Sequence, residues 1–245
     1  SSVLKNQDTE EIKKLVALYA AAGCQFFDLN ASIEALNAAK EGLSLVIPAK
    51  DLQDYALCVS VGTKNDPHFS KCNINTNLCT ACGKCKNVCP QDAIIEKNGK
   101  FKTITIKCIG CQKCLKSCGS NAITSKSTLI DLEETLPELV KLGISCIELH
   151  TICDDESEVD EKWALINNLF SGVLSISVER SEIGNKKIIS RLKRMLKCRP
   201  EYTTIIQADG APMTGGKDDY KTTLQAIAMA DIIEKANLPA YTIIS

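Results

Sequence analysis

The chain has 245 residues, enough for one large domain or for one domain with a small additional module, and its 44% apolar content excludes a disordered chain. The 29 basic and 30 acidic residues leave a net charge of −1, which argues against a general nucleic-acid binder. No apolar run is long enough to cross a membrane and no signal peptide is visible, so we expect a cytoplasmic protein with no membrane or nucleic-acid partner.

Residues 1–64 are predicted to form the first part of an α/β domain. The segment DTEEIKKLVALYAAAG begins with Asp8 or Thr9 as an N-cap, has apolar residues at helical spacing, and ends at Gly23, a typical C-cap residue. A short apolar strand is predicted over CQFFDLN, followed by a helix over SIEALNAAKEGLS and a second strand over YALCVSVG.

Residues 70–126 interrupt this alternation directly after the second strand. They are rich in lysine and cysteine and contain no long helical pattern, and eight of the 14 cysteines of the chain lie between Cys79 and Cys118. In parallel α/β folds the loops after the carboxyl ends of the strands form the functional edge. A module inserted here is therefore expected to face the pocket of the α/β domain.

Residues 128–245 are predicted to form the remainder of the α/β domain, with four more helices that alternate with the strands SCIELHT, GVLSISVE, YTTIIQADG and AYTIIS. The strands are continuous apolar runs, which indicates a parallel sheet covered on both faces. Six helix–strand units favour a (β/α) barrel-like domain, with an open doubly wound sheet as the alternative. Because a complete barrel needs eight strands, we expect an incomplete barrel and a fragment of a longer chain.

The cysteines of the inserted module form two copies of one motif. The first copy is Cys79-x2-Cys82-x2-Cys85-x3-Cys89-Pro90, and the second is Cys108-x2-Cys111-x2-Cys114-x3-Cys118-Gly119. The segments QDAIIEKNG and GSNAITSK, one after each copy, also match, which is expected of an internal repeat. Zinc is the alternative ligand, but zinc sites favour two CxxC pairs separated by a longer loop.

The spacing is that of bacterial ferredoxins, in which three cysteines bind one [4Fe–4S] cluster and the fourth binds the other cluster. We therefore predict two [4Fe–4S] clusters in an α+β ferredoxin-like module. The predicted ligands of cluster I are Cys79, Cys82, Cys85 and Cys118. Those of cluster II are Cys108, Cys111, Cys114 and Cys89.

Other segments extend the resemblance along the chain. The segments CVSVG at 58–62 and DPHF at 66–69, the double cysteine run, and DGAPMTGG at 209–216 together resemble the light-dependent period A family of iron–sulfur proteins. The resemblance implies electron transfer or redox sensing, with redox input to a circadian clock as in that family, and it supplies no catalytic residue. We therefore expect an electron-transfer or redox-sensing protein rather than an enzyme.

Two alternative functions remain open. One is a barrel oxidoreductase that the clusters connect to an external electron donor, such as a flavin-dependent reductase; no sequence motif supports a flavin, although a flavin in a barrel needs no short motif. In the other, the clusters only hold the small module folded.

The charge of the module indicates a type of partner. From Lys71 to Lys126 there are ten lysines and two acidic residues, a net charge of +8 before cluster binding. We expect this region to attract an acidic soluble electron carrier, a ferredoxin or a flavodoxin, unless the chain instead signals to a regulatory protein partner.

Two weaker site predictions lie in the α/β domain. Glu148 and His150 point to the same side of the strand SCIELHT and are candidates for an acid/base pair, although a structural histidine is the ordinary alternative. Gly215 and Gly216 belong to a glycine-rich loop after a strand, which could bind an anion or a phosphate or be a plain turn.

Two more residues lie near the cysteine motifs. His68 could tune a cluster from outside its ligand set, or it could be an ordinary loop residue. Cys72, seven residues before Cys79, could be a spare ligand or a redox-active thiol.

Overall fold

The computed structural model describes residues 8–64, 66, 69–108, 110–153, 155–179, 183–210 and 219–244. The glycine-loop prediction at Gly215 and Gly216 and the prediction at His68 lie outside the described residues. None of the helices in the described ranges is long and apolar enough to cross a membrane.

The first part of the α/β domain contains α1 (Thr9–Ala21), β1 (Phe26–Asn30), α2 (Ile33–Val46), the short 3₁₀ helix η1 (Ala49–Asp54) and β2 (Ala56–Val61). The side chains of Asp8 and Ser32 cap α1 and α2 by accepting hydrogen bonds from backbone N–H groups of the first turn. Gly23 follows α1 with a φ of +94°, a conformation that favours glycine. Local sequence signals therefore determine where these helices begin and end.

The remainder of the domain continues the alternation of helices and strands. Its elements are α5 (Leu132–Lys141), β7 (Cys146–His150), α6 (Glu156–Leu169), β8 (Val173–Val178), α7 (Asn185–Leu196), β9 (Thr204–Ala208), α8 (Asp219–Lys235) and β10 (Tyr241–Ile244).

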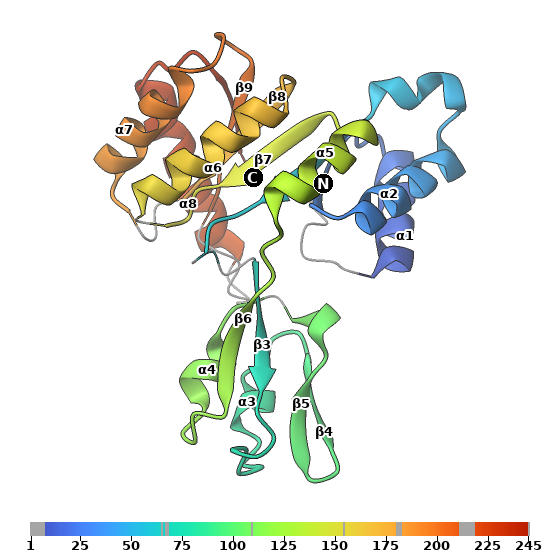
Figure 1. Ribbon diagram of the computed structural model, residues 1–245, viewed down its shortest axis with the longest axis vertical. Coiled ribbons are helices and arrows are strands. Elements are labelled where there is room, and N and C mark those ends of the chain that lie inside the picture. The colour runs from blue at the N-terminus through green and yellow to red at the C-terminus, as the bar shows by residue number, and fades with distance from the viewer. Residues whose placement is uncertain are drawn as a thin grey trace.

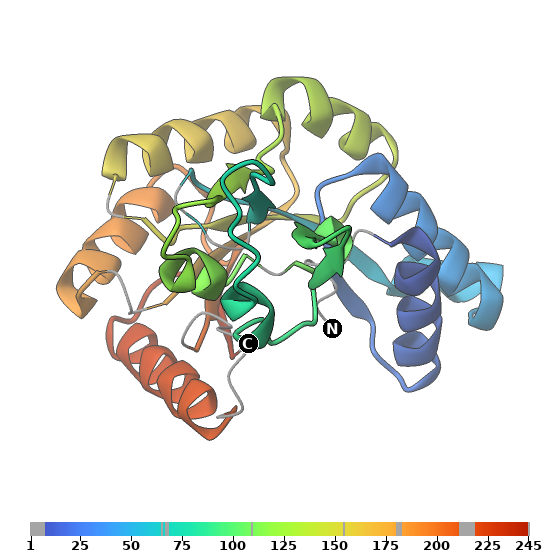
Figure 2. The same ribbon diagram turned by 90° about the horizontal axis from the view of Figure 1, so that it is seen from below.

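The six strands of the two parts form one parallel sheet in the order β1-β2-β7-β8-β9-β10. Each strand therefore lies beside the next strand of the domain along the chain, as in a (β/α) barrel, whereas the strand order of a doubly wound sheet reverses direction. Figure 2 shows the helices as an arc around the outside of the sheet. The sheet is a half-barrel, which confirms the barrel-like prediction and excludes the doubly wound alternative.

The two faces of the half-barrel sheet differ in chemistry. The face toward the helices is apolar and contributes to the main hydrophobic core, with fully buried residues such as Phe27, Leu29, Val59, Ile147 and Leu149. The alternating residues on the inner face are buried but polar, and they include Asp28, Ser60, Glu148, His150 and Ser177. The half-barrel therefore keeps a set of ionisable groups away from water.

The inserted module projects from the half-barrel between β2 and α5 (Figure 1). It contains β3 (Ser70–Ile74), α3 (Lys84–Asn87), β4 (Ile94–Lys97), β5 (Lys100–Thr103), η3 (Thr105–Lys107), α4 (Lys113–Ser117) and β6 (Ile123–Ser127). Strand β3 pairs with β6, and β4 pairs with β5, both antiparallel. The core of the module consists of a few apolar residues and several of the cysteines.

Candidate iron–sulfur site

Four cysteines line one cavity of the module, which we call the outer cavity. They are the residues predicted to bind cluster I, namely Cys79, Cys82, Cys85 and Cys118. Cys79 and Cys82 precede α3 and Cys85 lies within it, whereas Cys118 directly follows α4. The cavity therefore combines three cysteines of the first motif with the last cysteine of the second motif.

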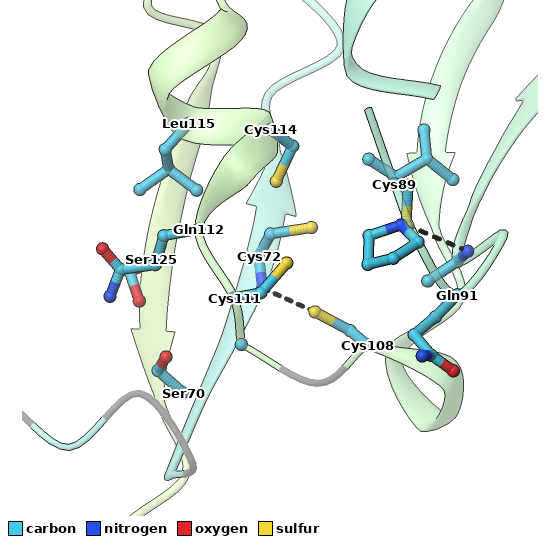
Figure 3. Close-up of a pocket in the computed structure, with 14 residues that line it drawn as sticks. Ser70, Cys72, Cys89, Gln91, Cys108, Cys111, Gln112, Cys114, Leu115 and Ser125 are labelled. Carbon is cyan, nitrogen blue, oxygen red and sulfur yellow. Dashed lines mark hydrogen bonds between the residues drawn. The ribbon is translucent and has the colours of Figure 1, made fainter. Parts of the chain in front are cut away.

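A second cavity, which we call the inner cavity, has the reciprocal composition. It is lined by the four residues predicted to bind cluster II, Cys89, Cys108, Cys111 and Cys114. A fifth cysteine, Cys72 on β3, also lines this cavity (Figure 3).

The register of β3 and β6 shows which cavity is nearer the half-barrel. Ser70 pairs with Ser127 at the end of the ladder where the module joins the half-barrel, and Ile74 pairs with Ile123 at the other end. Ser70 lines the inner cavity, whereas Ile74 and Ile123 line the outer cavity. The inner cavity therefore lies nearer the half-barrel, and the outer cavity lies toward the free end of the module.

The loops around both cavities have matched backbone geometry. Ala81 and Gly83 in the first motif have φ values of 58° and 75°, and Gly110 and Gln112 at the equivalent positions of the second motif have φ values of 71° and 57°. These left-handed residues let a short segment wrap around a cavity with its N–H groups directed inward. The two motifs are therefore repeated in three dimensions as well as in sequence.

Backbone N–H groups donate to the cysteine sulfurs. The N–H of Ala81 lies 3.4 Å from Cys79 Sγ, and the N–H of Ala93 lies 3.3 Å from Cys89 Sγ. Hydrogen bonds from Phe101 and Ala81 lower the pKa of the Cys79 thiol. Four sulfurs around one cavity with N–H donors directed at them are the chemistry that a [4Fe–4S] cluster requires, so both cavities fit the cluster.

Two lysines contact the cysteine loops in a crossed arrangement. The Lys71 ammonium donates to the Cys108 carbonyl oxygen at 2.6 Å, and the Lys100 ammonium donates to the Cys79 carbonyl oxygen. Sequence analysis missed both contacts. The available signal was that each lysine precedes the first cysteine of its own motif by eight residues.

The inner face of the half-barrel brings together the predicted pair on β7. His150 Nε2 lies 3.7 Å from Glu148 Oε1, and His150 Nδ1 lies 3.1 Å from Asp66 Oδ2. Burial lowers the pKa of His150, but its pairing with Asp66 and the negative charges around it outweigh burial and raise the pKa above its usual value. His150 is therefore expected to be a buried imidazolium at neutral pH.

Glu148 is expected to hold a proton under the same conditions. Burial raises its pKa to about 8, the charge of Asp28 adds to this effect, and His150 opposes it. The Ser60 hydroxyl contacts both Asp28 and Glu148, the latter at 3.1 Å. Since a hydroxyl has one proton to donate, both contacts are hydrogen bonds only when one of the two carboxyl groups is protonated.

Phe69, directly before the first strand of the module, packs against residues of the half-barrel. Its ring packs edge-on against His150, with ring centroids 5.4 Å apart and an interplanar angle of 89°. The ring also lies over Gly62, where an added Cβ would clash with it. Gly62 and Phe69, one residue from each of two segments singled out in the sequence, therefore meet just after the carboxyl end of β2.

Comparisons with known proteins agree with these observations. Residues 138–245 match the light dependent period A C-terminal domain. Residues 78–123 match the 4Fe-4S dicluster domain. The chain combines these two domains. The dicluster domain implies two [4Fe–4S] clusters, which confirms the cofactor prediction.

A curated relative extends the similarity over most of the chain. The protein "Light dependent period A" of Synechococcus elongatus is 29% identical over 208 residues, which are 83% of this chain and 57% of the relative. The chain thus spans little more than half the length of this relative.

Proposed function

We propose that this chain is an electron-transfer or redox-sensing protein with two [4Fe–4S] clusters. The observation that carries the proposal is the pair of cavities, each lined by three cysteines of one motif and the last cysteine of the other. The outer cavity would hold cluster I and the inner cavity cluster II, with the ligand sets predicted above. When bound, each cluster supplies one-electron transfer within the known range of iron–sulfur potentials.

The test is anaerobic purification, quantitation of iron and sulfide, and an EPR-monitored redox titration. We expect about eight irons per chain and two reversible one-electron signals. Zinc in place of iron, or fewer than four irons, would overturn the proposal.

Three cysteine variants test the crossed ligand assignment. Cys82→Ser removes a ligand of the outer cavity and Cys111→Ser one of the inner cavity, so their spectra identify the signal of each cluster. Cys118→Ser should reproduce the spectrum of Cys82→Ser, although Cys118 belongs to the second motif. A spectrum like that of Cys111→Ser would show that each motif binds its own cluster. Cys198→Ser, at an exposed cysteine outside both cavities, is the matched control.

We further propose that an acidic soluble carrier, a ferredoxin or a flavodoxin, docks at the free end of the module. Lys84 and Lys86 are exposed there beside the exposed Cys82 of the outer cavity. Opposite charges accelerate association in a salt-dependent way. Stopped-flow electron transfer from a reduced ferredoxin should slow as ionic strength rises, and more steeply for this chain than for Lys84→Gln/Lys86→Gln. A rate independent of salt would refute the docking proposal.

One observation favours a second candidate function, a barrel oxidoreductase. Glu148 and His150, both with raised pKa values, lie on a strand of a barrel-type sheet, where such enzymes place acid and base groups. A flavin bound in stoichiometric amount by the anaerobic protein would support an enzyme. A flavin-free protein with eight irons would favour the electron-transfer or redox-sensing function. For the whole protein we would then propose redox input to a circadian clock, the role of the family that the chain resembles.

A further inference from the structure

The internal repeat extends to the residues before each cysteine motif. Lys71 and Cys72 precede Cys79 by eight and seven residues, and Lys100 and Phe101 precede Cys108 by the same spacings. Each lysine contacts the carbonyl group of the first cysteine in the other motif. The two halves therefore give the two cavities equivalent cationic groups.

The backbone contacts at the next position are equivalent as well. The N–H of Cys72 lies 3.4 Å from Cys108 Sγ, and the N–H of Phe101 donates to the sulfur of Cys79. Each first cysteine thus receives a hydrogen bond from the strand of the other half. The backbone at these positions does not distinguish the cavities.

The side chains at these equivalent positions do distinguish them. The Phe101 ring forms part of the apolar wall of the outer cavity. The Cys72 side chain instead extends among the cysteines of the inner cavity (Figure 3), and its thiol is within hydrogen-bonding reach of the Cys108 and Cys114 sulfurs. The inner cavity therefore has a thiol where the outer cavity has a phenyl group.

Thr103 orients this thiol. Its Oγ1 lies 3.1 Å from Cys72 Sγ, and the hydroxyl can be the donor. When Thr103 donates to the sulfur, the S–H of Cys72 is available to the ligand sulfurs. The equivalent residue in the other half is Ile74, whose side chain has no donor.

We propose that Cys72 is a potential-tuning residue of the inner cavity, and that the difference between Cys72 and Phe101 makes the two clusters inequivalent. The inference rests on the proposed function, because it needs a cluster in each cavity. Reduction adds a negative charge that is shared with the ligand sulfurs, so a donor directed at those sulfurs stabilises the reduced state. Cys72 therefore raises the reduction potential of the cluster in the inner cavity.

Exchange of the two equivalent side chains tests the proposal. Cys72→Phe gives both cavities a phenyl group, and Phe101→Cys gives both a thiol. In an anaerobic EPR redox titration, Cys72→Phe should make reduction of the inner cluster about tenfold less favourable, the effect of one hydrogen bond to a charged group, or about 59 mV for a one-electron couple. The outer cluster should keep its potential. Phe101→Cys should shift the outer cluster in the opposite direction.

Smaller substitutions control for the case in which the phenyl group of Cys72→Phe does not fit in the inner cavity. Cys72→Ala removes the thiol without adding volume and should lower the same potential, and Thr103→Val should lower it by less. Cys24→Ala, at a partly buried cysteine of the half-barrel, is the matched control and should change neither potential.

The outcomes separate this inference from the proposed function. Wild-type protein with zinc in place of iron, or with fewer than four irons, would refute the proposed function. Eight irons with less than a twofold change in the inner-cluster equilibrium for Cys72→Ala would refute only the tuning role. Loss of four irons in Cys72→Ala would show that Cys72 is a ligand, which also overturns the inference.

Discussion

The contact between Gly62 and Phe69 should control how firmly the module is attached to the half-barrel. An ideal Cβ at Gly62 would lie 3.0 Å from Phe69 Cγ and closer still to Cδ2 and Cε2. Real Cβ atoms do not approach other atoms so closely, so in Gly62→Ala the ring must move. The ring cannot move freely, because His150 packs against it at a centroid distance of 5.4 Å.

The cost of this displacement is that of an overpacked core, about 1–3 kcal/mol. For a chain of 245 residues, each kcal/mol corresponds to about 2–4 °C in Tm. The assay is urea unfolding of the cluster-loaded protein under anaerobic conditions, followed by fluorescence of Trp163. This residue is the one tryptophan of the chain, and its indole N–H donates to the Met195 carbonyl oxygen inside the half-barrel.

Two comparisons make the result specific. Gly119→Ala adds the same methyl group in the module where nothing lies within 4 Å, so it should be close to neutral. Phe69→Leu shortens the opposing side chain, so the double variant Gly62→Ala/Phe69→Leu should be less destabilised than the sum of the two single variants. A Gly62→Ala protein as stable as the wild type, or strictly additive effects, would refute the reasoning.

Three further predictions follow from the buried charges and the cysteines. Between pH 6 and 8 the free energy of unfolding should fall with rising pH, and the slope should be about 1 kcal/mol per pH unit steeper for wild type than for Glu148→Gln. The reason is that native Glu148, with a pKa of about 8, keeps a proton that the unfolded chain has lost above about pH 4.5. Urea unfolding at each pH measures the two slopes. Arg191→Met should destabilise the half-barrel in the same assay by about 1–3 kcal/mol for each buried carbonyl oxygen left without a donor, because the fully buried Arg191 donates to the carbonyl oxygens of Thr151 and Cys153 as well as to Glu156. Removal of iron with a chelator should make the module sensitive to limited proteolysis while Trp163 fluorescence keeps its native maximum, because the module has a small core of its own.

A specific result would contradict each of these predictions. Equal pH slopes for wild type and Glu148→Gln would mean that Glu148 is ionised in the native protein. Arg194→Met, at a partly exposed arginine that also contacts Glu156, should cost much less than Arg191→Met, and equal costs would contradict the argument from burial. Equal protease resistance of the module with and without iron would show that the clusters do not hold it folded.

Glu156 illustrates how the direction of a pKa shift depends on the charged groups around the side chain. Burial alone would raise its pKa, but hydrogen bonds from Arg191 and Arg194 outweigh burial and lower the pKa to about 2. Glu148 has a histidine and other carboxyl groups around it, and its pKa rises instead. Glu148 lies in the predicted strand SCIELHT, whereas Glu156 directly precedes the segment SEVDEKWALINNLF, and neither position shows from the sequence which charged groups the fold brings beside it.

The sequence by itself determined the features that depend on local spacing. Caps and apolar periodicity located the helices, and apolar runs located the six strands of the sheet, because these signals act over a few residues. The two cysteine motifs predicted the cluster type for the same reason. Even the crossed ligand sets were a prediction from spacing, since three cysteines two residues apart can face one cluster and the fourth is displaced.

Only the tertiary structure decided the features that join distant segments. The choice between a half-barrel and a doubly wound sheet depended on the order of the strands, which apolar runs of similar composition do not specify. The thiol of Cys72, its partner Thr103 and the predicted ligand Cys108 come from three segments that the fold brings to one cavity. Such contacts depend on how β3, β5 and the cysteine loop pack against one another, and spacing along the chain carries no information about that packing.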